Sequence, residues 1–373
     1  MNWQEGSGEG VTLRLVAAAA EAMDVQSYTV PAEPKVQQPL ARPRVALEIR
    51  GRLRLPSEQA YDLISERFRE MGHIALLRRT PEGELIEAIA GGPPSGRANA
   101  RLAVILFAIT VVSVLSVFGL EETGGGGLGV NWLKGLPFTV SLLSILLAHE
   151  MGHYLVAHWL GLPASLPFFI PMPLSLFGTL GAVMQLQAPP RTRQALLALG
   201  AAGPLAGLIV AIPVLLLGLS LSEIQPISGG PGVFQEGNSL LYLAVKYAVF
   251  GQILPANGVD VRLDPVAMAG WAGLLLTGIN LLPVGQLDGG HIAYALLGER
   301  ARLLAGVVII GLAALAFLWW GWLILVGLAF IFGRAHAVPL DDVSQPGARW
   351  RAFAVGMLVL AALVFVPVPM EPL

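Results

Sequence analysis

Long, nearly uncharged apolar runs constrain this chain more than any other feature. A membrane-spanning helix needs about 20 apolar residues, and six apolar runs follow one another at 102–120, 138–160, 195–219, 266–282, 303–332 and 352–366. The run at 303–332 is long enough for a tight helical hairpin broken around Gly321. Only 13% of the 373 residues are Asp, Glu, Lys or Arg, against about 25% in a soluble domain. The sequence therefore predicts an all-α polytopic membrane protein with about six to seven transmembrane helices.

The first hundred residues differ, because they hold about half of the Lys and Arg and no run that could span. Residues 1–43 are polar and acidic and contain proline, so we expect a disordered tail without the pattern of a signal or transit peptide. Residues 44–91 predict a small α+β module of order β-α-β-β, with strands at 45–50, 74–78 and 85–90 and a helix at 56–71. Residues 92–101 are the expected linker to a membrane-embedded domain at 102–373.

Arginines near the ends of the runs predict the orientation, because Lys and Arg gather in cytoplasmic loops. If the spans alternate, one face holds Arg97, Arg101, Arg191, Arg193, Arg300, Arg302, Arg334, Arg349 and Arg351. The N-terminal module is then cytoplasmic, in a multi-pass protein of a cell (inner or plasma) membrane. Without a plastid transit peptide, a bacterial membrane is the expected location. The run at 240–253 is short and carries Lys246, so we expect an interfacial helix there.

Net charge and cysteine content exclude several classes of function. The formal net charge is -2, which argues against a nucleic-acid binder that depends on bulk electrostatics. The chain has 0 Cys, so it can form neither a disulfide nor a thiolate metal site. Any metal must be held by His, Asp or Glu.

The second apolar run contains ionisable residues, which are costly in a membrane and suggest function. It includes His149-Glu150-Met-Gly-His153, and a spacing of four places both histidines on one face of a helix. Two imidazoles so placed can bind one zinc ion, and Glu150 beside them suits a general base acting on water. The alternative is a chance match, with histidines that are satisfied by hydrogen bonds inside a helical bundle.

A catalytic zinc usually has three protein ligands, so a third is expected elsewhere. The fourth run ends in Asn280-Leu-Leu-Pro283, and Asp288-Gly-Gly-His291 follows shortly after. Pro283 and the glycines permit unwound backbone around Asp288, which we favour as the third ligand. An N-cap is the alternative role for Asp288, and His291 is the rival ligand. His73, His158 and His336 are expected to be structural.

A strand-like stretch follows the second run, where Pro163, Pro167, Pro171 and Pro173 prevent a helix. Residues 177–187 alternate in strand fashion while remaining apolar, which predicts a re-entrant β-hairpin beside the metal. Its edge could pair with an unwound substrate segment, and we assign substrate binding to Gly181, Val183 and Gln185. An ordinary cytoplasmic loop is the alternative.

These residues together resemble the site-2 protease family of intramembrane zinc metalloproteases. The resemblance rests on His149-Glu-Met-Gly-His153 with Asn280-Leu-Leu-Pro283 and Leu287-Asp288-Gly289, and covers about residues 100–335. The stretches at 177–187 and 199–207 are similar to the cyanobacterial and plastid branch, the ethylene-dependent gravitropism-deficient yellow-green type. The latter stretch includes Gly203-Pro-Leu-Ala-Gly207, a small-residue face that could pack closely on the metal helix.

The resemblance implies hydrolysis of peptide bonds within the bilayer and release of a membrane-anchored factor. One catalytic Zn²⁺ would be held by His149, His153 and Asp288, and Glu150 would transfer the proton of the attacking water. Asn280 would bind the substrate backbone or the developing oxyanion, with helix–helix contact as its alternative role. The implied partners are single-pass or membrane-anchored protein substrates and the lipid bilayer.

Two other functions remain open from the sequence. A transporter or channel could use buried His and Asp as an ion path, but it should scatter charges over several spans. A catalytically inactive family member could bind membrane proteins without cleaving them, although His149, Glu150, His153 and Asp288 are all intact.

Overall fold

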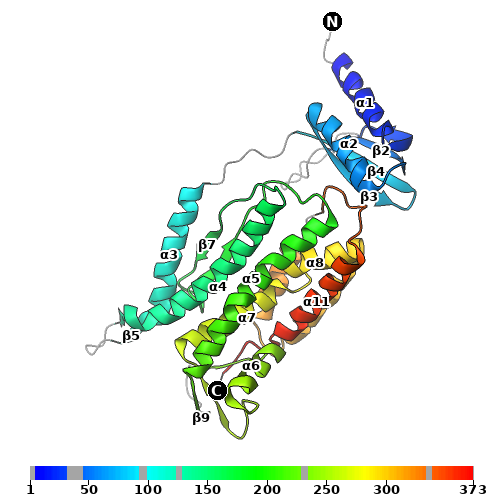
Figure 1. The fold of residues 1–373 in the computed structure, drawn as a ribbon. Coiled ribbons are helices and arrows are strands. Elements are labelled where there is room, and N and C mark those ends of the chain that lie inside the picture. Colours follow the sequence, from blue (N-terminus) through cyan, green and yellow to red (C-terminus); the bar gives the residue numbers. More distant parts are fainter. Residues whose placement is uncertain are drawn as a thin grey trace. The chain divides into compact units, whose positions relative to one another are not determined.

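The computed structural model describes residues 5–31, 45–91, 99–122, 128–227, 234–332 and 338–372. Two units make up the chain, and each is described by itself. Unit 1 contains residues 1–96, 187–196 and 337–347, and unit 2 contains the remainder. Figure 1 shows the helices and strands of both units, coloured along the sequence.

Unit 1 is built on a four-stranded antiparallel sheet of order β1-β2-β4-β3. Its elements are α1 (Glu5–Ala20), β1 (Met23–Thr29), β2 (Val45–Leu53), α2 (Ser57–Glu70), β3 (His73–Thr80) and β4 (Gly83–Ala90). The elements from β2 to β4 follow the expected β-α-β-β order. Ile64 and Phe68 of α2 lie on one face of the helix and are buried against the sheet. Such amphipathic spacing places the apolar face of the helix on the core.

The expected disordered tail is wrong for residues 5–31, which carry α1 and β1. Leu15 and Ala19 of α1 and Met23 of β1 are 2%, 0% and 0% exposed in the core of unit 1. Small alanine side chains let α1 approach the sheet closely, so a stretch that looks polar overall still buries one face. Residues 32–44 and most of the expected linker, 92–98, lie outside the described residues.

Tyr61 of α2 is a buried polar residue of unit 1. Its hydroxyl donates a hydrogen bond of 3.2 Å to the Ala75 carbonyl of β3. Burial raises the pKa of Tyr61 to about 12, and the nearby Arg191 guanidinium opposes that rise. The phenol therefore stays protonated and keeps its donor role at ordinary pH.

Unit 2 is mainly helical. Its helices are α3 (Ala100–Gly119), α4 (Trp132–Trp159), most of α5 (Arg193–Ser220), α6 (Leu240–Phe250), α7 (Pro265–Asn280), α8 (Asp288–Leu297), α9 (Ala301–Leu315), α10 (Trp322–Phe332) and α11 (Ala348–Val364). Among the described residues, α3, α4 and α5 are long and apolar enough to cross a membrane, and α6 and α7 are shorter apolar helices. The turn between α9 and α10 contains Gly321, as expected.

Four two-stranded antiparallel sheets connect these helices. They are β5 (Leu120–Glu122) with β6 (Leu128–Val130), β7 (Phe168–Pro171) with β8 (Thr179–Val183), β9 (Glu223–Pro226) with β11 (Val259–Arg262), and β10 (Phe234–Glu236) with β12 (Met370–Pro372). Strand β8 lies within residues 177–187, where the sequence predicted a strand, and β7 lies in the proline-containing stretch before it. The β7–β8 hairpin packs against α3 and α4, so it lies beside the helix that carries both candidate histidines.

Lys246 of α6 is completely buried. The sequence predicted an interfacial helix here, but it did not predict the burial of this side chain. Its ammonium lies 3.2 Å from Asp260 Oδ1 and 3.7 Å from Glu236 Oε1. The Tyr242 hydroxyl donates to Glu236 at 3.1 Å, and burial raises the pKa of Glu236. Two carboxylates compensate the buried cation, so α6 is held in the structure by charge pairs as well as by apolar packing.

Candidate metal centre

Helix α4 supplies two histidines and one glutamate to a buried site. The helix is continuous over 28 residues, so the spacing of four places His149 and His153 one above the other. His149 and Glu150 are 6% and 7% exposed, and the His153 side chain is 12% exposed. Three ionisable groups in an apolar helix require compensating partners.

Asp288 reaches the site because the chain turns sharply between α7 and α8. Gly285 has φ +54° within this turn, a conformation that glycine adopts without strain. A Cβ on Gly289 would lie 1.9 Å from the Leu281 carbonyl oxygen, so only glycine fits. Asp288 is the first residue of α8, and the N-cap is Leu287 without a side-chain cap. The side chain of Asp288 is therefore directed to the histidines instead of capping its helix.

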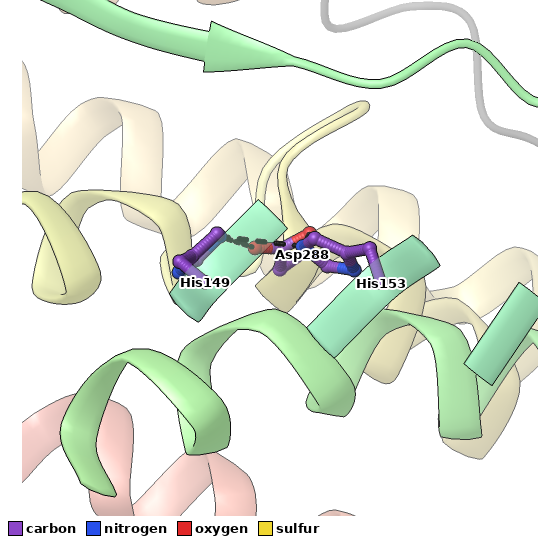
Figure 2. Close-up of side chains that lie close together, drawn as sticks. All are labelled: His149, His153 and Asp288. Atoms are coloured by element: carbon purple, nitrogen blue, oxygen red, sulfur yellow. Dashed lines mark hydrogen bonds and ion pairs between the residues drawn. The ribbon is translucent and has the colours of Figure 1, made fainter. Parts of the chain in front are cut away.

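Figure 2 shows the three side chains converging, with Asp288 between the two imidazoles. His149 Nε2 lies 3.2 Å from Asp288 Oδ2, and His153 Nε2 lies 3.3 Å from Asp288 Oδ1. The two Nε2 atoms are 3.3 Å apart. Within the described residues, these three form a group of His and Asp side chains that could hold a metal ion, because their ligand atoms all lie within 4.8 Å of one another.

Helix α5 lies directly behind the histidines and fixes their rings. The Leu199 carbonyl is 2.9 Å from His153 Nδ1, which leaves Nε2 directed at Asp288. A Cβ on Gly203 would lie 2.1 Å from His153 Nε2, and one on Gly207 would lie 3.3 Å from the His149 ring. The expected close packing of this small-residue face on the metal helix is therefore confirmed. Second-shell hydrogen bonds of this kind set the tautomer and orientation of a ligating histidine.

Glu150 and Asn280 lie at the edge of this group. The Glu150 carboxylate interacts electrostatically with His149, His153 and Asp288. The Asn280 side-chain nitrogen, at the end of α7, is 3.5 Å from His149 Nε2.

None of the other described histidines belongs to this group of ligand atoms. The His291 backbone N–H donates to the Leu287 carbonyl, and His291 is not part of the group of ligand atoms. His158 is exposed on α4 and stacks on Tyr154, and His73 Nδ1 contacts the Met71 carbonyl in unit 1. His336 lies outside the described residues.

The expected substrate-binding residues lie on or just after β8. Gly181 and Val183 are within the strand, and Val183 is 52% exposed. Gln185 follows it, and its backbone N–H and carbonyl already bond to Ser165, each at 2.9 Å. Only the side chain of Gln185 is therefore available to a substrate.

Sequence reasoning did not identify the Leu199 carbonyl, because a backbone acceptor has no residue-type signature. It also did not identify Gly200, where a Cβ would lie 2.9 Å from the Asp288 carbonyl oxygen. The signal that could have found both is the small-residue spacing of α5 itself. Gly200, Gly203 and Gly207 face Asp288, His153 and His149 in turn.

Comparison with known proteins agrees with the geometry. Residues 137–318 match the family model "Peptidase family M50". The chain is 34% identical over 247 residues to "Probable zinc metalloprotease EGY2, chloroplastic" of Arabidopsis thaliana, covering 63% of this chain and 42% of the relative. It is 34% identical over 245 residues to "Probable zinc metalloprotease EGY1, chloroplastic" of the same plant, covering 62% and 43%.

The relatives are longer than this chain and carry a location in their names. The chain spans about two fifths of the length of these relatives, 42% and 43%. Their names place those proteins in the chloroplast, which conflicts with the bacterial location expected from the sequence, while the membrane assignment is unchanged. The matched segment contains His149, Glu150, His153, Asn280 and Asp288. The resemblance found in the sequence is therefore confirmed, because residues 137–318 match the model of peptidase family M50, the site-2 protease family.

Proposed function

We propose that this chain is an intramembrane zinc metalloprotease that hydrolyses peptide bonds in or near the transmembrane segments of membrane-anchored proteins. The observation that carries the proposal is the convergence of the candidate ligand atoms. The Nε2 atoms of His149 and His153 are 3.3 Å apart, and they lie 3.2 and 3.3 Å, respectively, from the two different carboxylate oxygens of Asp288. In a tetrahedral zinc site with bonds of about 2.0–2.1 Å, neighbouring ligand atoms are about 3.3–3.4 Å apart. Two neutral imidazoles and one carboxylate are also a donor set that zinc accepts.

The proposed ion is a single Zn²⁺ held by His149, His153 and Asp288, with an open fourth position. When bound, zinc supplies Lewis-acid activation of a scissile carbonyl and of a water molecule. Glu150 takes the proton of the attacking water and returns it to the leaving amine. The Asn280 amide donates a hydrogen bond to the substrate carbonyl as negative charge develops on its oxygen.

Strand β8 is the proposed binding site for the substrate backbone. Within the described residues its one strand partner is β7, so the other backbone edge of β8 carries no strand. Leu180 and Val183 on β8 are 58% and 52% exposed. An unwound substrate segment can add to such an edge through main-chain hydrogen bonds, with Gly181, Val183 and the Gln185 side chain in contact with it. We propose that this hairpin is re-entrant, because apolar strand backbone survives at membrane depth only where protein buries it.

The alternatives are less favoured by these observations. A transporter should carry buried ionisable groups along a path through several helices. In the described helices of unit 2, the buried ionisable residues are His149, Glu150 and Lys246. An inactive relative should lack part of the site, whereas Glu150 and the three ligand candidates are present.

Removal of the metal tests the proposal. Purified protein in proteoliposomes, supplied with a tagged single-pass peptide containing a helix-breaking Gly-Pro midsection, should cleave it within the membrane segment. 1,10-phenanthroline should abolish cleavage, and added Zn²⁺ should restore it, because the chemistry depends on the bound ion. Metal analysis should give about one zinc per chain. Undiminished cleavage by protein stripped below about a tenth of an equivalent would exclude a zinc-dependent mechanism.

We also propose six to seven spans with the N-terminal module on the cytoplasmic side, from the arginine asymmetry along the sequence. Alkaline phosphatase fused after Arg193 or after Arg300, expressed in a bacterial host, should be inactive because the enzyme folds only outside the cytoplasm. A fusion at Gly124–Gly127 should be active. Active enzyme at Arg193 would reverse the orientation and the side that receives the product.

A further inference from the structure

A cavity of about 270 Å³ lies in unit 2, between β10 and the C-terminal segment that contains β12. Its charged lining residues are two carboxylates, Glu236 and Glu371, and no Lys or Arg is among the described residues that line it. Pro255, Pro367 and Val368 form an apolar part of its wall. The cavity therefore places negative charge beside apolar surface, a combination that suits a long side chain with a cationic end.

Hydrogen bonds of the backbone fix the shape of this cavity. The Gly237 N–H donates to the Pro369 carbonyl at 2.8 Å, and β10 pairs with β12. The Trp271 indole N–H donates to the Gly237 carbonyl at 2.8 Å, and the Trp322 indole N–H donates to the Pro367 carbonyl at 2.8 Å. Both walls are thus anchored to helices of unit 2, which lowers the cost of ordering the site when a ligand binds.

Glu236 brings an incompletely compensated charge to the cavity. Its side chain is largely buried, and the side-chain contacts that it receives from Tyr242 and Lys246 are both made to Oε1. The Lys246 ammonium lies closer to Asp260, at 3.2 Å against 3.7 Å, so a single ammonium serves two buried carboxylates. Glu371 adds a third carboxylate at the cavity. A further cation in the cavity would stabilise this group of carboxylates.

Asn238 supplies an independent indication of a ligand. It lines the cavity beside Glu236, and its Oδ1 atom is buried without a hydrogen-bond partner among the described residues. A buried acceptor left unpaired is costly, and such atoms are rare in folded proteins. An ammonium or guanidinium group carries several donors and no acceptor, so it can bond to an amide oxygen and to carboxylates at once.

A basic side chain fits these groups better than a bare metal ion. Among the described residues, Glu236, Asp260 and Glu371 do not form a group whose ligand atoms all lie within 4.8 Å of one another. An ion would also make no use of the apolar part of the wall. The methylene groups of Lys or Arg can cover that apolar surface while the charged end reaches the carboxylates.

Helix α7 connects this cavity to the candidate metal centre. Trp271, which binds Gly237, precedes Asn280 by nine residues, or about 14 Å of helix rise. Asn280 lies beside His149 at the end of the same helix. A peptide segment held at the metal can therefore reach the cavity with a residue about nine positions away if the segment is helical, or about four positions away if it is extended.

We propose that this cavity binds a basic side chain, Lys or Arg, on one flank of the transmembrane segment that the protease cleaves. The inference rests on the proposed function and adds a determinant of substrate choice that lies away from the metal. Glu236 and Glu371 bind the charged end of the side chain, and Asn238 Oδ1 accepts one of its hydrogen bonds. The apolar part of the wall contacts its methylene groups.

Binding of labelled single-pass peptides to full-length Glu150→Gln protein in nanodiscs tests the site without interference from cleavage. The peptides carry either Lys or norleucine at four or at nine residues from a Gly-Pro midsection, on one flank or on the other. On one flank only, Lys should strengthen binding about tenfold over norleucine, because charge-assisted hydrogen bonds are strong. Glu371→Gln and Asn238→Ala should each reduce this ratio to below about threefold.

Glu223→Gln is the matched control. Glu223 is exposed on β9, and it does not line the cavity, so the ratio should stay within about twofold of the parent. Zinc content and circular dichroism of each variant show whether unit 2 is folded. The side chain of Glu371 is exposed on a short strand, so Glu371→Gln decides the result if Asn238→Ala does not fold.

The outcomes separate this proposal from the proposed function. Equal affinity for Lys and norleucine peptides at every position overturns the proposal, and so does a preference for Lys that is the same on both flanks or that survives Glu371→Gln. Binding of Ca²⁺ that is lost in Glu371→Gln, with no preference for Lys, assigns the cavity to a metal ion and also overturns it. A preference for Lys in a parent protein that cleaves neither peptide contradicts the proposed function and leaves the binding site in place.

Discussion

Replacing Glu150 by Gln is expected to lower the rate of cleavage by at least about a hundredfold, because general acid–base catalysis contributes about 10²- to 10⁴-fold. The amide keeps the shape of the side chain, which is 7% exposed in α4, but it cannot accept the proton of the attacking water. Zinc should remain bound at about one equivalent, since Glu150 is not among the three candidate ligands. The measurement is single-turnover cleavage of the tagged peptide, with metal content determined on the same sample.

Glu299→Gln is the matched control for this substitution. Glu299 makes an exposed ion pair with Arg302, both side chains being 60% exposed, and exposed pairs contribute little to stability. Its cleavage rate should stay within about twofold of the parent. A Glu150→Gln protein that retains zinc and cleaves within about tenfold of the parent would remove Glu150 from the role of general base.

The elements and site residues that could be predicted from the sequence depend on the spacing of residues that are close together in the chain. The histidine pair needs only a helix through residues 149–153, and the apolar run guarantees one. The strands and the helix at 45–90 follow from alternation and amphipathic spacing, which neighbouring residues determine. The proximity of Asp288 to the histidines was predictable because a carboxylate between Pro283 and the Gly289–Gly290 pair stood out in an apolar segment, where the histidine pair already called for a third ligand.

The features that could not be predicted depend on contacts between segments that are far apart in the sequence. Arg78 of β3 donates to the carbonyl of Leu340, which is 262 positions away, and no local pattern near either residue indicates that contact. Lys246 looked like the polar edge of an interfacial helix, because its partners Glu236 and Asp260 come from two separate strands. Helix α1 was missed for a related reason, since only the finished sheet buries its alanine face.

Loss of the third ligand is expected to be as damaging as loss of the base, but through a different step. Asp288→Ala should weaken zinc binding by more than about a hundredfold. Losing a residue that only orients a ligand weakens metal binding by about 10- to 100-fold. The reason is that Asp288 contacts both histidines, at 3.2 and 3.3 Å, so the substitution removes a proposed ligand and also the group that holds the pair together. Equilibrium dialysis against a zinc chelator at fixed pH measures this affinity, and circular dichroism shows whether the helices persist.

His291→Ala distinguishes the two candidate ligands in the same assay. His291 lies three residues along α8 from Asp288, yet it is outside the group of converging ligand atoms. Its removal should change zinc affinity by no more than about threefold, well below the effect of losing a ligand or its direct support. The opposite ranking would mean that α8 presents His291 to the metal. The site would then be a three-histidine centre, and the carboxylate of Asp288 would act only as a partner that orients the imidazoles.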